Sequence, residues 1–118
     1  MKKISARQFL VEVKELIKSP CYWCKNAWAK TKRGIGVQPD HPEARRWCLG
    51  GAMRCIDKKY PGNDAYTKAH RKVKEVIKNC AVIDFNDSHT HKEVIEVLDT
   101  AINSLTRRKK CQEEKSSV

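Results

Sequence analysis

The chain has 118 residues, with 25 lysines and arginines against 14 aspartates and glutamates, and a formal net charge of +11 at pH 7. This length is typical of one domain, and a hydrophobic content of 40% is too high for a disordered chain. No stretch approaches the roughly 20 consecutive apolar residues of a transmembrane helix, and the basic start leads into an amphipathic pattern that does not resemble a signal peptide. We therefore expect a cytoplasmic protein with reduced thiols and no membrane partner.

Apolar residues recur three and four positions apart along most of the chain, which is the spacing of a helix with one buried face. The pattern predicts helices over residues 5–18, 21–31, 40–56, 64–79 and 90–105. The apolar run near residues 81–87 has no partner strand, and we expect a short extended segment there. The predicted fold class is therefore all-α, a compact array of four to five helices.

Three of these helices begin with the spacing of a capping box, in which two side chains satisfy free amides of the first turn. The pairs are Ser5 with Gln8, Asp40 with Glu43, and Thr90 with Glu93. The capping boxes support helix starts at these positions.

The charge is unevenly distributed. Residues 1–33 carry a net charge of +7 and residues 64–80 carry +3, whereas residues 81–105 carry −4. Residues 106–118 add +3 and contain almost nothing apolar, so we expect a single helical domain over residues 1–105 followed by a flexible basic tail. This distribution favours a surface for an anionic partner, and a merely solvated lysine-rich face is the alternative.

Two segments that lie 24 residues apart both begin with a Trp-Cys pair and continue into small residues. They are Trp23-Cys24 and Trp47-Cys48, and the second is followed by Gly50. Tryptophan buries a large surface, and small residues one turn on allow a close approach. We expect two helices that pack through these segments.

In these and later motifs the sequence resembles an uncharacterised family of small proteins from bacteria and phages. The later motifs are Phe85-Asn86-Asp87, Thr90 to Val94 and Leu98 to Ile102, and the resemblance covers about Cys21 to Leu105. Its polar cluster in this chain consists of Asn86, Asp87 and Thr90. The resemblance implies a shared fold and a phage or mobile-element setting, and it supplies no activity.

Cys21 and Cys24 have the C-x-x-C spacing of half a zinc site. Cys48, Cys55 and His41 are available as further ligands, but no second pair has ligand spacing. We therefore expect no cofactor, with zinc at Cys21 and Cys24 as the alternative. The simpler interpretation treats most of the thiols as small buried apolar groups. It applies to Cys24, Cys48, Cys55 and Cys80.

The segment that precedes the last helix holds the densest group of polar residues. Asp84, Asp87, His89 and His91 are close enough in sequence to bind a divalent metal or to act as an acid and a base. The alternative is that the segment forms a turn and a helix cap, with Phe85 inserted into the core.

Basic residues alternate with tryptophan in a way that suits phosphate contacts and base stacking, and we expect Trp28 to be the exposed aromatic residue. The predicted site for an anionic partner consists of Lys25, Trp28, Lys30, Lys32, Arg33, Arg45, Arg46, Lys68, Arg71 and Lys72.

The leading functional hypothesis is a non-enzymatic accessory protein of a phage or mobile element. Its basic surface would bind nucleic acid, a nucleotide signal or an acidic face of a host protein. No familiar catalytic motif favours an enzyme. Two alternatives stay open: a small metal-dependent enzyme built on residues 84–91, and a homo-oligomer in which the acidic last helix meets a basic helix of a neighbour.

Overall fold

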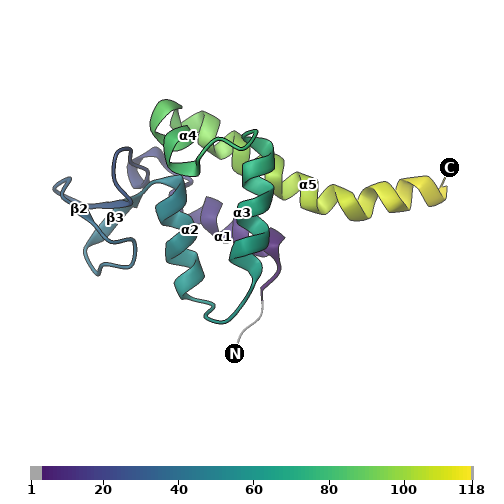
Figure 1. Cartoon of the computed structure of the whole chain (residues 1–118), viewed down its shortest axis with the longest axis horizontal. Helices are drawn as coiled ribbons and strands as arrows, with labels where there is room; N and C mark the ends of the chain where they lie inside the picture. Colours follow the sequence, from purple (N-terminus) through teal and green to yellow (C-terminus); the bar gives the residue numbers. More distant parts are fainter. Residues whose placement is uncertain (1–3, 118) are drawn as a thin grey trace.

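The computed structural model describes the backbone of residues 4–117 and the side chains of residues 4–105. The described part of the chain forms five α-helices and a three-stranded antiparallel sheet (Figure 1). The fold is therefore mixed α and β, and the all-α prediction is wrong. The error lies between residues 21 and 48, where one helix and the first half of another were expected and the chain forms a sheet and its connections.

The first helix, α1 (Ala6–Ile17), confirms the prediction for this segment. Ser5 is its N-cap, and the Ser5 hydroxyl accepts a hydrogen bond from the Gln8 amide at 3.0 Å. The apolar residues spaced three and four apart form its buried face. They are Phe9, Leu10, Val13 and Ile17.

A short 3-10 helix, η1 (Pro20–Tyr22), leads into the strands β1 (Ala29–Thr31), β2 (Gly36–Val37) and β3 (Ala44–Trp47). The strand order is β2-β1-β3, and both pairings are antiparallel. In the central strand, Ala29 and Thr31 are buried and Lys30 is not, so burial has the period of two that is typical of a strand. A strand of three residues is too short for its alternating burial to be distinguished from helical spacing in the sequence. The pairing of β1 with β3 joins residues far apart in the chain, so the sequence around either strand does not indicate it.

The remaining helices are α2 (Leu49–Lys58), α3 (Ala65–Val76), α4 (Val82–Ser88) and α5 (His91–Ser117). The position of α3 and the start of α5 agree with the predicted helices, although α5 continues to Ser117, beyond the predicted end at residue 105. By contrast, α2 covers only the second half of the helix expected over residues 40–56. The extended segment expected near residues 81–87 is wrong, because that segment forms α4. A short apolar run does not distinguish a strand from a helix by periodicity alone.

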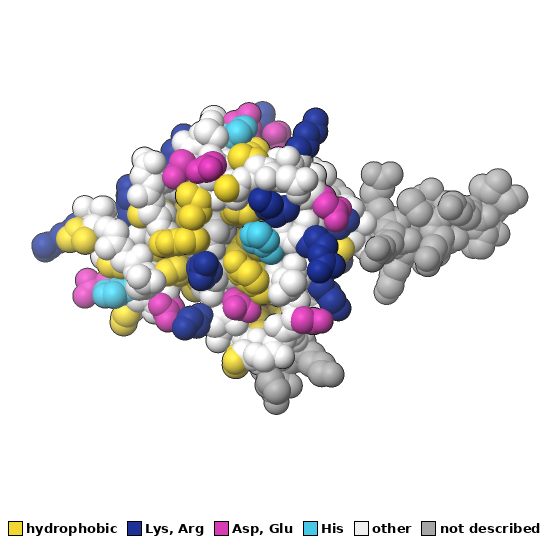
Figure 2. Space-filling view, viewed as in Figure 1, with side chains coloured by type: hydrophobic (Ala, Val, Ile, Leu, Met, Phe, Trp, Pro, Cys, Tyr) yellow, Lys and Arg dark blue, Asp and Glu magenta, His cyan; other side chains and the backbone are white. Residues whose placement is uncertain are grey.

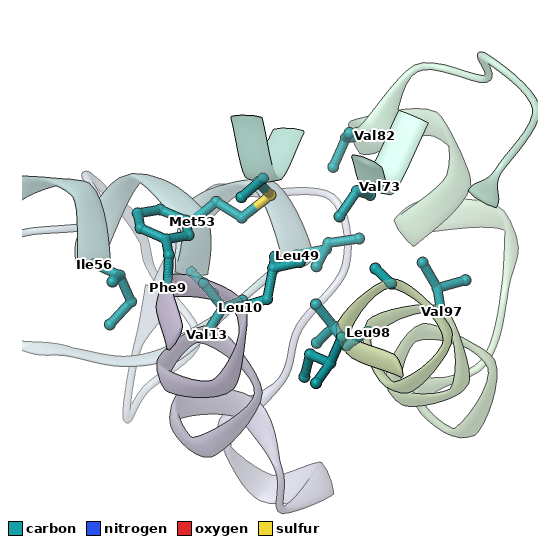
Figure 3. Close-up of a cluster of buried hydrophobic side chains, with 14 of the residues drawn as sticks. Phe9, Leu10, Val13, Leu49, Met53, Ile56, Val73, Val82, Val97 and Leu98 are labelled. Carbon is teal, nitrogen blue, oxygen red and sulfur yellow. The ribbon is translucent and has the colours of Figure 1, made fainter. Parts of the chain in front are cut away.

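The hydrophobic core lies where α1 packs against α2, α3 and α5. Figure 3 shows the α1 side chains Phe9 and Leu10 meeting Leu49 and Met53 of α2, with Leu98 of α5 closing the cluster. All five side chains have at most 1% of their surface exposed, so this contact excludes water.

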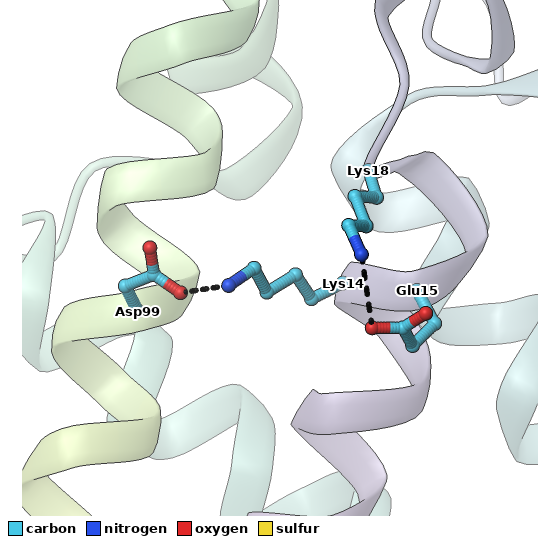
Figure 4. Close-up of polar contacts among 4 residues, drawn as sticks. All are labelled: Lys14, Glu15, Lys18 and Asp99. Atoms are coloured by element: carbon cyan, nitrogen blue, oxygen red, sulfur yellow. Dashed lines mark ion pairs between the residues drawn. The ribbon is translucent and has the colours of Figure 1, made fainter.

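An ion pair between described residues joins the first and last helices. The Lys14 ammonium lies 2.6 Å from the Asp99 carboxylate, whereas the nearby Lys18 and Glu15 are 4.0 Å apart (Figure 4). Part of the negative charge of α5 therefore has its partner within the same molecule.

Within the described part of the chain, no helix has both the length and the apolar character needed to span a bilayer. The flexible tail predicted at residues 106–118 lies outside the side chains that the structure describes, and it stays a prediction.

Two glycines at the start of α2 lie against Trp28. A Cβ atom added to Gly51 would lie 1.8 Å from the Trp28 carbonyl oxygen, and one added to Gly50 would lie 2.9 Å from the Trp28 ring. The Trp28 carbonyl also accepts the Cys48 amide at 3.2 Å, so the backbone cannot move away without losing this hydrogen bond. The expected close approach at these glycines is confirmed.

We predict that Gly51→Ala lowers the free energy of unfolding by about 3 kcal/mol, because the overlap involves backbone and cannot be relieved by rotating a side chain. Without the overlap, alanine in a helix would stabilise the protein by about 0.5–1 kcal/mol. Urea unfolding measures the difference. Gly36→Ala is the matched control, because its Cβ would meet only the Ala27 Cβ at 3.8 Å. Equal stability of the two variants would contradict the prediction.

Candidate functional site

The two Trp-Cys segments meet in space. Trp23 and Trp47 form an isolated parallel β-bridge, and the Cys24 amide donates to the Trp47 carbonyl at 3.2 Å. Both indoles are half-buried, and each donates its N–H inward: Trp23 to Asn86 at 2.7 Å, and Trp47 to the Pro39 carbonyl at 2.8 Å. Only the second segment opens a helix, so the expected packing of two helices through both segments is wrong. The segments join the sheet to the helices instead.

Both thiols of these segments are buried. The Cys48 sulfur caps α2 by accepting the Gly51 amide at 3.2 Å. Burial raises the pKa of the Cys24 thiol to about 11, and the neighbouring Cys48 adds to this rise. Burial also raises the pKa of Cys48. Cys21, by contrast, is exposed, and Cys55 and Cys80 are half-buried.

The residues considered for zinc do not converge. Cys24 points to the Ala27 carbonyl at 3.7 Å, Cys21 lies 3.2 Å from the Ser19 hydroxyl, and His41 accepts the Glu43 amide through Nδ1 at 3.0 Å. Among the described residues, no three His, Cys, Asp or Glu side chains lie close enough to share a metal ion.

Asn86 is the most highly connected polar residue of the motif cluster, and its side chain is fully buried. Its Oδ1 accepts the Trp23 indole N–H at 2.7 Å and the Leu49 amide at 2.9 Å. Its Nδ2 donates to the Cys24 carbonyl at 3.0 Å and to the Asp87 carboxylate at 3.1 Å. The amide therefore makes all four hydrogen bonds of which it is capable.

The other two residues of the motif cluster also have structural partners. Asp87 accepts the Asn26 amide at 2.9 Å, where Asn26 adopts a positive φ of 66°. Thr90 and Glu93 form the predicted capping box, since the Thr90 amide donates to Glu93 at 2.9 Å and the Glu93 amide donates to Thr90 at 3.2 Å.

The two histidines considered for acid–base or metal chemistry point in different directions. The His89 ring stacks on Phe85 with centroids 3.8 Å apart, and its Nδ1 lies 2.8 Å from the Phe85 carbonyl. The His91 Nε2 lies 2.8 Å from the Ile17 carbonyl, at the end of α1. Asp84 is exposed on α4. The structure does not bring these groups together around one position.

The structure divides the ten residues predicted to contact an anion into separate groups. Five lie on the strands and turn of the sheet, and we call them the sheet cations. They are Lys30, Lys32, Arg33, Arg45 and Arg46. Lys30 stands directly opposite Arg46 across the β1–β3 pair. Lys32, Arg33 and Arg45 line one hollow of about 440 Å³, together with Ile35 and Glu43.

A second group lies on α3, and α2 stands between this helix and the sheet (Figure 1). In this group Lys68 pairs with Asp64 at 3.3 Å and Lys72 pairs with Glu75 at 3.0 Å, whereas Arg71 is exposed. These ion pairs already neutralise two of the three charges.

The last two predicted residues lie between η1 and β1. The Lys25 ammonium sits 5.7 Å from the centre of the Trp23 ring. Trp28 is half-buried, and the Arg54 guanidinium lies 4.6 Å from the centre of its ring. Sequence reasoning missed Arg54, because nothing in the local sequence of α2 indicates a contact with a residue of a distant loop.

The fold and the site thus define a small mixed α/β protein in which the motif residues are structural and four of the five sheet cations are exposed, with Lys30 half-buried. The chain belongs to a family of unknown function, DUF6197, which matches residues 1–104. The expected membership of an uncharacterised family is thereby confirmed. No curated protein and no solved structure matches the chain.

We predict that Asn86→Ala lowers the free energy of unfolding by about 3 kcal/mol or more, because it leaves several buried polar groups without partners. Asn86→Asp keeps the acceptor for Trp23 and Leu49 but loses the donors to Cys24 and Asp87 and places a buried carboxyl group beside the Asp87 carboxylate, so we expect a loss at least as large. Urea unfolding checks both variants, with exposed Asn103→Ala as the control. An Asn86→Ala protein as stable as this control would contradict the structural role.

We also predict that alkylation discriminates between the cysteines. At about pH 8, a thiol with a pKa of about 11 is ionised to roughly one part in a thousand, and only the thiolate reacts. Among the cysteines whose side chains are described, Cys21 should therefore be modified first in the native protein, and Cys24 and Cys48 last. Peptide mapping by mass spectrometry gives the order, and alkylation in urea is the control. Fast alkylation of Cys24 in the native protein would contradict the buried position of this thiol.

Proposed function

We propose that this protein is a non-enzymatic binding protein whose sheet cations contact a nucleic acid. The observation that carries the proposal is the cross-strand pair Lys30 and Arg46. Like charges directly opposite each other destabilise a pair of strands. Within the described residues neither side chain forms an ion pair. A bound polyanion would convert this repulsion into attraction.

The neighbouring charges support the same conclusion. Lys32, Arg33 and Arg45 extend the positive charge along the β1–β2 turn and β3, and the hollow that they line contains one carboxylate, Glu43. The other acidic residue of this region, Asp40, lies 3.7 Å from Lys58 of α2. Lysines would act as point charges on phosphates, whereas arginines can hold two phosphate oxygens at once.

The proposal places this activity in a phage or mobile-element setting, in the cytoplasm. The resemblance in the Trp-Cys and Phe-Asn-Asp motifs supports the setting, and the basic charge supports the partner. An acidic face of a host protein is the alternative anionic partner. Binding of a nucleic acid would depend more steeply on salt and would be abolished by nuclease, whereas binding of an acidic protein would survive nuclease treatment.

We predict that the double variant Lys30→Gln/Arg46→Gln binds a short duplex DNA or heparin about tenfold more weakly at low salt, because two phosphate contacts are lost. The slope of log affinity against log salt should fall by about two. Fluorescence anisotropy across a salt series measures both quantities.

The control is Lys59→Gln/Lys92→Gln, which removes the same charge from exposed positions at the end of α2 and the start of α5, away from the sheet. It should bind like the wild type. A triple variant of Lys68, Arg71 and Lys72 tests the α3 group separately. Equal weakening by all three variants would contradict a role for the sheet, since it would show that only net charge matters. If the wild type captures an acidic host protein after nuclease treatment, and the Lys30→Gln/Arg46→Gln variant does not, the alternative partner is favoured.

A further inference from the structure

A second candidate site lies away from the sheet cations, where α2, α3 and the start of α4 meet next to Trp28. It is a pocket of about 220 Å³, which we call the Trp28 pocket. Its walls include Trp28, Arg54, Tyr66, His70, Lys74 and Ile83. Figure 2 shows apolar and basic side chains, with a histidine, gathered over this region of the molecule.

The charged groups of the pocket are both cations. Arg54 and Lys74 supply two cations, His70 supplies an imidazole and Tyr66 a hydroxyl, and none of the described carboxylates lines the pocket. Within the described residues Arg54 forms no ion pair, and the Lys74 ammonium donates only to the Asn79 carbonyl at 3.0 Å. The pKa of His70 is lowered by burial, then by Lys74 and Arg54, which agrees with a positive potential inside the pocket. An anion would be the complementary ligand.

The remaining walls are flat and apolar. The Arg54 guanidinium lies over the Trp28 ring, and the His70 ring stacks on Tyr66 with centroids 5.8 Å apart. Gly50 brings Trp28 against the start of α2, which fixes this wall. Ile83, at 41% exposure, is an apolar side chain left open to solvent beside these rings. A ligand with a planar ring would cover it.

A larger hollow of about 420 Å³ adjoins the Trp28 pocket, and Trp28 and Ile83 line both. Asn26 and Asp87 lie in this second hollow. The Asp87 Oδ1 is occupied by hydrogen bonds, whereas Oδ2 makes none within the described residues. The two hollows therefore offer cations at one end and a hydrogen-bond acceptor at the other. The larger hollow lies within the range of about 300–1,000 Å³ that is typical of small-molecule sites, and the Trp28 pocket extends it.

We propose that the Trp28 pocket and the adjoining hollow bind a nucleoside monophosphate. Arg54 and Lys74 bind the phosphate, the base lies against Trp28 and Ile83, and Asp87 accepts a hydrogen bond from an amino or hydroxyl group of the ligand. This site is independent of the sheet cations and of the nucleic-acid partner proposed for them.

The test is isothermal titration of the full chain with each common nucleoside monophosphate, with adenosine and with inorganic phosphate. We expect saturable binding of at least one monophosphate, and weaker binding of the nucleoside and of free phosphate. Arg54→Gln and Lys74→Gln should each weaken the monophosphate at least about tenfold, because each removes a charge-assisted hydrogen bond. Arg71→Gln is the matched control, because it removes an exposed charge from the same helix as Lys74.

Thermal melting shows whether each variant is folded. Ile83→Asp gives a second test, because its carboxylate would repel the phosphate of the ligand at the exposed side of the pocket and weaken binding. The proposal is overturned if no monophosphate saturates, if adenosine or free phosphate binds as tightly, or if folded Arg54→Gln binds like the wild type. The Lys30→Gln/Arg46→Gln protein should keep full affinity for the monophosphate, and Arg54→Gln should keep the salt-dependent binding of DNA. A failure of one proposal is thereby distinguished from a failure of the other.

Discussion

The structure depends on the side-chain amide of Asn86. A buried amide is costly unless its hydrogen bonds are made, and here three of its four partners come from distant parts of the chain, while the fourth is the neighbouring Asp87. The Trp23 indole and the Cys24 carbonyl precede the sheet, and the Leu49 amide begins α2. One side chain of α4 therefore fixes where the sheet joins the helices. A sheet of strands with two to four residues would be marginal alone, so its position relies on this junction.

The same junction explains why the sheet can carry unpaired cations. Alternation along β1 places Ala29 and Thr31 inward, where burial stabilises the strand, and leaves Lys30 outward. The bridge between Trp23 and Trp47 and the two inward indole hydrogen bonds hold the neighbouring chain in place. The unfavourable Lys30–Arg46 pair is tolerated because other contacts keep the strands together.

The sequence predicts the helices at both ends of the chain well, because their apolar spacing is sustained and their caps are local: Ser5 with Gln8, and Thr90 with Glu93. The prediction from the sequence fails between residues 21 and 48 for two reasons. The strands there are too short to show alternating burial in the sequence, and they pair with residues that are distant along the chain. Asn86 is misread for a similar reason. An Asn-Asp-Ser run suggests a turn, and only the contacts from Trp23 and Leu49 show a buried hub. The walls of the Trp28 pocket come from separate elements, so no motif marks it.

The sheet cations and the cations of the Trp28 pocket differ in how much side-chain conformational freedom they would lose when a ligand binds. Lys32 and Arg33 extend from an exposed turn, so fixing each of them on a phosphate costs side-chain entropy, and many weak contacts must act together. That arrangement suits a long polyanion. The Arg54 guanidinium already rests on the Trp28 ring, and Lys74 is half-buried and bonded to Asn79. Less freedom remains to be lost there, so a few contacts suffice for a small ligand. Preorganisation, more than the number of charges, therefore separates the Trp28 pocket, which we propose binds a nucleotide, from the sheet cations, which we propose bind a nucleic acid.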